Sequence, residues 1–171
     1  QAATAADSTA EAKAPSMNIR FIDADSITTH YNLAKDFKDI AIRAISKLEN
    51  AQQNKGAEIQ RFAAQIEQKY RSNGYLSQAS YEADMNKLNK MQQDAQNYLA
   101  NLQNTTDQEM AEQRQQLNDS IENYIKIYNA GKGYDAILYR HSGVYFNPDL
   151  DITNEIIEGL NARYNKVEKA N

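Results

Sequence analysis

Apolar side chains recur at alternating steps of three and four residues through most of this chain. No proline occurs from Ser26 to Tyr128, and the only glycines in that stretch are Gly56 and Gly74. This spacing predicts two long helices that share a coiled-coil seam. The pattern reads the same outward in both directions from Gly74, which predicts an antiparallel fold-back between Asn73 and Gly74.

The expected seam alternates apolar positions with a few polar ones. Its positions before the fold-back are Tyr31, Ala34, Lys38, Ala41, Ile45, Leu48, Gln52, Lys55, Ile59, Phe62 and Ile66. Its positions after the fold-back are Tyr81, Met85, Leu88, Gln92, Ala95, Leu99, Leu102, Thr106, Glu109, Gln113 and Leu117. Because Gly74 lacks a side chain, we expect it to take the left-handed conformation that ends the first helix, with Ser77 or Ser80 starting the second.

The seam is expected to be weak near its middle. Gln52 and Lys55 face Gln92 and Ala95 there, and Gly56 is adjacent. A lost Leu-sized contact costs about 2 kcal/mol, and a glycine inside a helix costs about 1 kcal/mol. We therefore predict a pivot at Gln52, Lys55 and Gly56; the alternative is an uninterrupted helix with a polar face.

Short strands and a last helix flank the helical hairpin. Strands are predicted over 17–24, 136–140 and 144–147, with a turn at 141–143 joining the last two. Asp25 or Ser26 is expected to cap the first long helix, and Asp151 and Thr153 offer caps for the final one. The apolar side of that final helix consists of Ile156, Ile157, Leu160 and Tyr164.

Strands this short have too little apolar partner surface in one chain to form a stable sheet alone. Either the sheet packs on the final helix and the hairpin base, or strands from several copies combine. We favour the second alternative. The residues expected in such a shared body are Ile19, Phe21, Ile137, Leu138, Tyr139, Val144 and Phe146.

The expected fold is therefore mainly α with a small β body. Residues 1–16 are predicted to be a disordered leader, rich in Ala, Ser and Thr. Residues 17–25 and 129–171 form the β body with a C-terminal helix, and residues 26–128 form the helical hairpin with its tip near 73–77. Any membrane association is expected to come from an N-terminal anchor upstream, since no apolar run approaches the roughly 20 residues that span a bilayer.

Composition narrows the class of partner. The chain is 41% hydrophobic and 25% charged, with a mean hydropathy of -0.80. These values are expected for helices that are exposed to solvent on most faces. Its net charge of -4 and lack of a basic stripe argue against nucleic acid. It has no cysteine, which excludes disulfides and thiolate metal sites.

A few apolar residues fall outside the seam and are candidate contacts for a partner chain. Met91 and Tyr98 lie seven residues apart on one stripe, and Tyr75 and Leu76 lie at the tip. Flexible helices that carry scattered Met and Tyr suit promiscuous binding. The alternative is that they are solitary exposed hydrophobes, which are common.

The sequence gives little support for catalysis, and no cofactor is expected. Asp23, Asp25 and His30 are a conceivable metal cluster, but a helix cap and a solvated histidine account for them better. A calcium loop is conceivable too, although Ile152 stands where such a loop needs glycine, and a turn and a cap are the better interpretation. Its ligands would be Asn147, Asp149, Asp151 and Glu158.

The segments after the hairpin resemble the Skp/OmpH family of periplasmic chaperones. The resemblance rests on residues 133–138 (GYDAIL), 143–147 (GVYFN) and 151–157 (DITNEII), together with residues 18–23 (NIRFID). It covers about Met17 to Tyr164. The 151–153 segment and the strand before it are the specific part, whereas the long helices match as helices.

The resemblance implies a homotrimer whose strands form a central body and whose hairpins enclose a cavity. It implies an ATP-independent holdase that carries unfolded outer-membrane proteins across the periplasm of the Gram-negative envelope. Familiar members are strongly basic and this chain is acidic, so no lipopolysaccharide or anionic-membrane contact is carried over. The alternative function is a structural or adaptor coiled-coil protein of the cell envelope.

Overall fold

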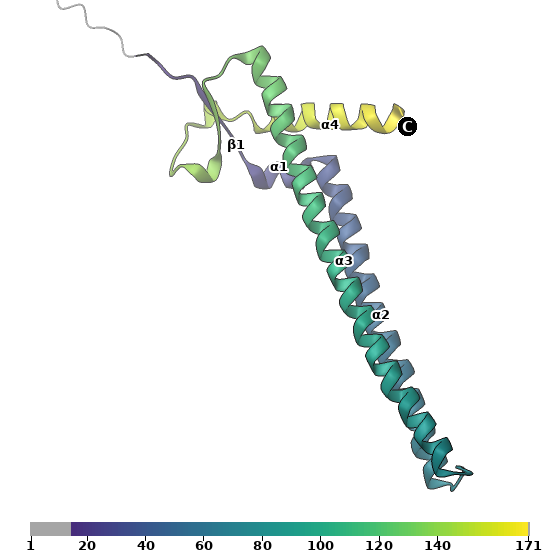
Figure 1. Ribbon diagram of the computed structural model, residues 1–171. Helices are drawn as coiled ribbons and strands as arrows, with labels where there is room; N and C mark the ends of the chain where they lie inside the picture. Colours follow the sequence, from purple (N-terminus) through teal and green to yellow (C-terminus); the bar gives the residue numbers. More distant parts are fainter. Residues whose placement is uncertain (1–14, 171) are drawn as a thin grey trace, which may run out of the picture. The chain divides into compact units, whose positions relative to one another are not determined.

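A computed structural model describes residues 15–170, with side chains described as far as Val167. The expected leader therefore lies almost entirely outside the described residues. The chain divides into two compact units (Figure 1). We call Asn32–Glu122 the arm, and the residues before Asn32 and after Glu122 the body. The arm is therefore shorter at both ends than the hairpin expected over 26–128, and the body is correspondingly larger.

The first helix of the body is short and separate. Strand β1 (Ile19–Ile22) leads into α1 (Ala24–His30), whose N-cap is Asp23, and Tyr31 is extended before α2 begins at Asn32. The prediction of one helix running on from Asp25 or Ser26 is wrong. Burial of Tyr31 edge-on to Tyr164, with ring centroids 6.2 Å apart, accounts for the break, because a tertiary contact outweighs helix continuity.

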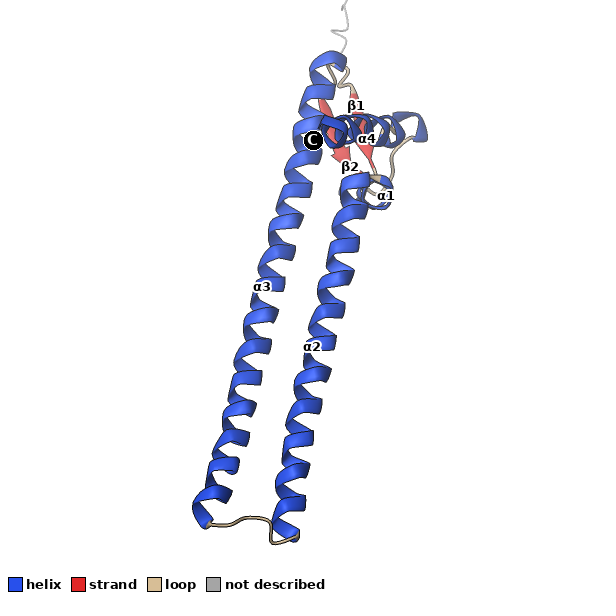
Figure 2. Ribbon diagram, turned by 90° about the vertical axis from the view of Figure 1, so that its right-hand side faces the viewer, coloured by secondary structure: helices blue, strands red, loops and turns tan. Residues whose placement is uncertain are grey.

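The arm consists of two long helices, α2 (Asn32–Arg71) and the greater part of α3 (Gln78–Lys132). They run antiparallel and side by side in Figure 2. Three side-chain pairs join them in reverse order along the chain: Lys55 over Tyr98, Lys87 over Phe62, and Tyr70 against Tyr81. The remaining residues of α3, from Asn123 onward, belong to the body.

The turn between α2 and α3 is fixed by local hydrogen bonds. The amide of Gly74 donates to the Lys69 carbonyl at 2.8 Å and that of Asn73 to the Tyr70 carbonyl at 3.2 Å, a Schellman motif. Asn73, with φ of 53°, takes the left-handed conformation, so the assignment of that conformation to Gly74 is wrong. A Cβ at Gly74 would lie 3.0 Å from Lys69 Cγ, so a larger residue there would have to displace the Lys69 side chain slightly.

The second helix of the arm starts at a reciprocal cap. The Ser80 amide donates to Ser77 Oγ at 3.2 Å, and the Ser77 amide lies 3.3 Å from Ser80 Oγ as donor in return. Of the two caps considered, Ser77 therefore holds the N-cap position. Two orphan amides are satisfied by this arrangement.

The seam of the arm is filled largely as expected, with small shifts. Its buried members are Ala34, Ile66, Ala95 and Thr106. On α2, Ile45 is 46% exposed, and Lys38 and Gln52 are exposed as well, so the assignment of these three to the seam is wrong. On α3, half-buried Met91 and Met110 take the places expected for the exposed Gln92 and Glu109. At these points the seam spacing allows either of two neighbouring residues to face α2. The apolar one of the two lies in the interface, because its burial removes more apolar surface from water.

The sheet of the body is parallel. Strand β2 (Ala136–Tyr139) pairs with β1 from Ile19 opposite Ala136 to Ile22 opposite Tyr139. On the other side of β1, Asp151 forms a single parallel bridge with Phe21, and the Ile152 amide donates to the Phe21 carbonyl at 3.1 Å. The prediction of a third strand over 144–147 is wrong, since a 3-10 turn (Arg140–Ser142) and irregular backbone follow β2.

A second 3-10 turn and the last helix close the body. The turn Pro148–Leu150 is capped by the Asn147 side chain, and α4 (Thr153–Ala170) by Asp151, whose Oδ1 accepts from the Thr153 amide at 2.9 Å. Thr153 Oγ1 accepts in turn from the Asp23 amide at 2.9 Å. This pair of bonds ties the start of α4 to the start of α1.

The core of the body lies where β1, α1 and α4 meet. Its side chains are Phe21, Ile22, Ile27, Tyr31, Ile152, Ile156 and Leu160. The expectation that one chain has no cover for its β segments is therefore wrong for β1, which packs on the final helix of the same chain. The alternative interpretation of the sequence, in which the sheet docks on that helix, holds for this strand.

Candidate interaction surfaces

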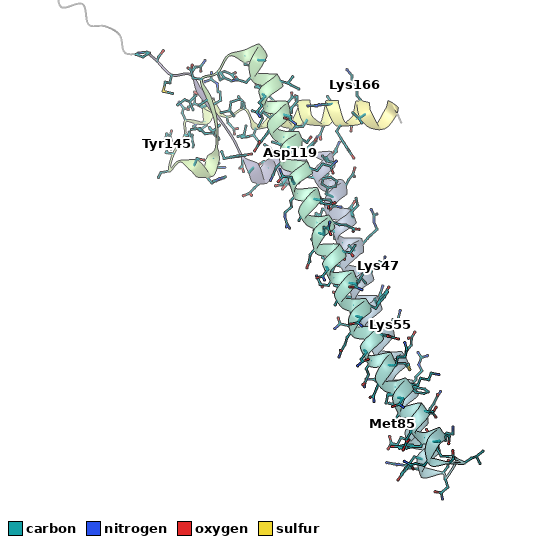
Figure 3. All side chains as sticks on the ribbon, in the orientation of Figure 1. Lys47, Lys55, Met85, Asp119, Tyr145 and Lys166 are labelled. Atoms are coloured by element: carbon teal, nitrogen blue, oxygen red, sulfur yellow. The ribbon has the colours of Figure 1, made fainter. Side chains whose placement is uncertain are left out.

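The most exposed apolar side chains of the body lie on the loop after β2. Val144 is fully exposed and Tyr145 largely so (Tyr145 is labelled in Figure 3). Phe146 turns inward and stacks on Phe21, with ring centroids 5.1 Å apart. A Cβ on Gly143 would lie 2.7 Å from the Phe146 ring, so glycine lets the loop curl over that ring. The loop presents Val144 and Tyr145 outward from a fixed base.

A cavity of about 360 Å³ lies beneath this loop. Phe21, Arg140, Phe146 and Asp151 are among its lining residues. The Arg140 guanidinium lies 3.3 Å from an Asp23 carboxylate oxygen, which anchors the 3-10 turn to the cap of α1. Burial favours a higher pKa for Asp23, but the amides of Asp25 and Ser26 and the Arg140 charge outweigh it and lower the pKa below its usual value.

The body residues chosen from the sequence differ in their surroundings. Phe21 is buried; Leu138 and Val144 are exposed. Half-buried positions are Ile19, Ile137, Tyr139 and Phe146. Tyr139 stacks on His141 with ring centroids 5.4 Å apart. Of this set only Leu138 and Val144 are exposed, and the role of the whole set in contact with another chain stays a prediction.

At the tip of the arm, Tyr70, Tyr75 and Tyr81 lie around the turn. Tyr75 lies 5.3 Å from the Tyr81 ring, and its hydroxyl donates to Asp84 at 2.9 Å. Lys69 lies over the Tyr75 ring at 4.4 Å. Burial, then the Asp84 carboxylate, raises the pKa of Tyr75. Tyr75 is thus held in place, whereas Leu76 is fully exposed.

The other two contact candidates differ from one another. Met91 is half-buried in the arm, and Tyr98 is exposed with Lys55 Nζ 5.3 Å from its ring centroid. At the predicted pivot, α2 continues without a break through Gln52, Lys55 and Gly56. A Cβ on Gly56 would meet nothing within 4 Å, so packing does not require glycine there. The pivot stays a prediction.

Tyrosines also join α3 and α4 inside the body. The Tyr128 hydroxyl donates to Glu155, and Lys132 Nζ lies 4.0 Å from the same carboxylate. Burial raises the pKa of Tyr128, and the hydrogen bond and charge of Glu155 raise it further. Burial and Glu155 raise the pKa of Tyr124 as well. The Tyr124 ring lies directly on Gly159, where a Cβ would come within 1.6 Å of the phenol oxygen.

Four of the residues considered for metals have structural roles. Asp23 accepts from the Asp25 amide at 3.0 Å, and His30 Nδ1 lies 2.9 Å from the Ser26 carbonyl oxygen. Asn147 and Asp151 cap the turn and helix described above. Among residues 15–170, no group of three or more His, Cys, Asp or Glu side chains is arranged to hold a metal ion.

The structure exposes a set of isoleucines that the sequence did not single out. On α2, Ile42 is 53% exposed and Ile45 46%, and Ile40 is at the border of exposure. The sequence signal for Ile45 was misleading, since its spacing also fits the seam. Ile42 lay outside the seam and could have been found by the same criterion that selected Tyr98.

Within the described part of the chain, no helix is both long and apolar enough to cross a membrane.

The fold consists of a small α/β body and an arm of two long antiparallel helices. The family model for outer membrane protein (OmpH-like) matches residues 18–160. The chain therefore belongs to the OmpH-like family, as its resemblance indicated.

A solved structure shares the fold. It comes from Caulobacter crescentus CB15 and represents a candidate outer membrane chaperone (OmpH-like). The TM-score is 0.76, with 14% sequence identity and coverage of 86% of each chain. No curated protein matches the chain significantly.

Proposed function

We propose that this protein is a periplasmic, ATP-independent holdase chaperone that binds unfolded outer-membrane proteins. It works as a homotrimer whose arms enclose the client. The observation that carries the proposal is membership in the OmpH-like family over residues 18–160. The solved relative of the same fold is itself a candidate outer membrane chaperone.

The exposed loop of the body supports the trimer. Val144 and Tyr145 project from a base fixed by the Phe21–Phe146 stack. The outer side of β2 also carries Leu138 at the surface. Apolar side chains gathered beside an unpaired strand edge favour association with other chains. Neighbouring copies supply the cover that this part of the sheet lacks.

The arm supports reversible binding of a client. Its exposed apolar side chains are spread along the arm. Tyr70 and Leu76 lie near the tip, Tyr98 lies within α3, and Ile42 and Ile45 lie in the first part of α2. Each contact is weak, but several on one tethered client add up through effective concentration. A carrier without an energy source needs such binding, because the client must leave when its folded state becomes accessible.

The holding assay tests this function directly. A urea-denatured outer-membrane β-barrel protein is diluted into buffer with and without the purified protein, and aggregation is followed by light scattering. We expect near-complete suppression at a near-stoichiometric ratio of trimer to client, with no nucleotide added. Aggregation equal to that with an inert protein of the same mass contradicts the proposal. A defined complex with a folded envelope protein under those conditions would instead indicate an adaptor.

A further inference from the structure

The turn at the tip of the arm contains the only asparagine of the chain that is followed by glycine. Asn73 and Gly74 lie in the loop that joins α2 to α3, at the lower end of the arm in Figure 2. Both residues are exposed, so water reaches them. We call this pair the Asn–Gly step.

The Asn–Gly step brings an electrophile and a nucleophile together within one chain. The Cγ of Asn73 is an amide carbon, and attack on it by the backbone nitrogen of Gly74 closes a five-membered ring. The two groups are already tethered to each other, so the reaction needs no second molecule to bring them together. Glycine favours the attack, because it has no Cβ to obstruct the approach and its backbone is the most flexible.

The reaction balances without an oxidant or a reductant. The nitrogen of Gly74 gives its proton to solvent and bonds to Cγ of Asn73, while the bond from Cγ to Nδ2 breaks and Nδ2 takes a proton and leaves as ammonia. Water then opens the cyclic imide at one of its two carbonyl carbons. Opening at Cγ gives aspartate, and opening at the backbone carbonyl carbon gives isoaspartate. Either product adds one negative charge.

The turn restrains this reaction in the folded arm. The Gly74 amide donates to the Lys69 carbonyl at 2.8 Å, so the nitrogen that must lose its proton holds that proton in a hydrogen bond. The Ser72 hydroxyl donates to the same carbonyl at 3.3 Å. The attack therefore requires local opening of the turn.

Asp84 of α3 holds the turn closed from the other helix of the arm. It accepts from the Tyr75 hydroxyl at 2.9 Å, and Tyr75 follows Gly74 directly. Its carboxylate also lies 3.6 Å from Nζ of Lys69, the residue whose carbonyl binds the Gly74 amide. Asp84 thus connects both sides of the hydrogen bond that restrains the Asn–Gly step.

We propose that the Asn–Gly step is a site of spontaneous deamidation whose rate is set by opening of the turn. The proposal goes beyond the holdase function and does not rest on it. Isoaspartate adds a methylene to the backbone before Gly74 and moves the Gly74 amide away from the Lys69 carbonyl. Aspartate places a negative charge at the negative end of the α2 dipole. Either product weakens the turn, so the change at the tip runs in one direction.

Peptide mapping of the aged full-length protein tests the site. The protein is kept in mildly alkaline buffer and digested with trypsin, which releases residues 72–87 as one peptide. Conversion of Asn73 is measured from the mass gain when its amide becomes an acid. Fragment ions separate Asn73 from Asn86, the matched internal control, which precedes a lysine inside α3. We expect Asn73 to convert and Asn86 to keep its amide.

Two comparisons test the part played by the turn. In urea that unfolds the chain, Asn73 should convert at least about tenfold faster than in the folded protein. D84A should accelerate both the conversion and amide exchange at Gly74 about three- to tenfold, because it removes the hydrogen bond and ion pair at Asp84. D94A is the matched control, since Asp94 forms an ion pair with Lys90 within α3, and it should change neither rate.

A milder variant guards against general damage to the arm. D84N keeps an acceptor for the Tyr75 hydroxyl and loses only the charge, so its conversion rate should lie between those of the parent and D84A. Circular dichroism checks that both variants keep their helices.

Three outcomes overturn the proposal. One is retention of the Asn73 amide in urea, which would show that the Asn–Gly step does not react. Another is an equal conversion rate in the folded and the unfolded protein, and the third is faster Gly74 exchange in D84A without faster conversion of Asn73. The last two would show that opening of the turn does not set the rate.

Discussion

At the scale of single residues, Tyr124 packs directly on Gly159 in the body. The phenol occupies the space of a Cβ at that position, so only glycine lets α4 approach α3 here. Nearby, Tyr128 and Glu155 join the same two helices by a hydrogen bond. One small residue and two tyrosines thus determine how closely these two helices pack.

Gly159→Ala should therefore destabilise the body despite the better helix propensity of alanine. We expect a loss of about 1–3 kcal/mol in the free energy of unfolding, because the new methyl group overlaps the Tyr124 ring. Urea denaturation followed by circular dichroism measures it.

Gly131→Ala is the matched control for this substitution. Gly131 also lies in a helix, but a Cβ there meets nothing within 4 Å, so alanine should stabilise by about 0.5–1 kcal/mol. Equal stability of the two variants would contradict the role given to Tyr124.

At the scale of elements, the sequence predicts what depends on local chemistry. The long helices, strands β1 and β2, the Ser77 cap and the apolar side of α4 all follow from short-range patterns, and the structure has them. The break at Tyr31 does not follow, since it depends on Tyr164, which is far away in the chain. The third strand expected over 144–147 is absent for a similar reason. The alternation of apolar and polar residues there does not show whether a neighbouring strand is present to pair with it.

The candidate surfaces were predictable only in part. Leu76 and Tyr98 are exposed as their positions outside the seam suggested, but Met91 is half-buried and Ile45 is exposed. The steps of three and four leave two choices at each turn of a helix. Only the packing of α2 against α3 decides between them.

The turn of the arm offers a test at this scale. Asparagine tolerates the left-handed conformation at a φ of 53° better than alanine does, because its short polar side chain can form local hydrogen bonds. Asn73→Ala should therefore cost about 1 kcal/mol. Asn73→Gly keeps the Schellman motif and should change the stability by less than about half that amount. Amide exchange at Asn73 and Gly74 reports the loss of the two hydrogen bonds. Equal protection in the alanine and glycine variants would show that the left-handed residue is not limiting.

At the scale of the whole molecule, most of the core of the body is complete within one chain. Ile22, Ile27, Ile156 and Leu160 are almost fully buried without any partner. The apolar surface that one chain leaves exposed is smaller than the sequence suggested. It consists of the outer side of β2 and the loop that carries Val144 and Tyr145. Under the proposed trimer, association therefore joins bodies that are already folded.

Val144→Asp tests that interpretation. Val144 is fully exposed and makes little contact in its own chain, so the substitution should leave the fold intact and reduce the oligomer to monomer. Light scattering coupled to size exclusion gives the mass, and circular dichroism checks the fold. Leu76→Asp, at an equally exposed leucine of the tip, should leave the mass unchanged. A trimeric V144D protein would exclude the loop from the interface.

The antiparallel pairing of α2 with α3 also limits how the length of the arm can change in evolution. Residues added to one helix alone would displace every later pair, such as Tyr70 with Tyr81, and would leave the Asn73 turn out of register. Insertions or deletions must therefore occur in both helices at the same level, and in multiples of seven to keep each face where it is. Paired heptads are thus the unit by which relatives of this chain could change the length of the arm.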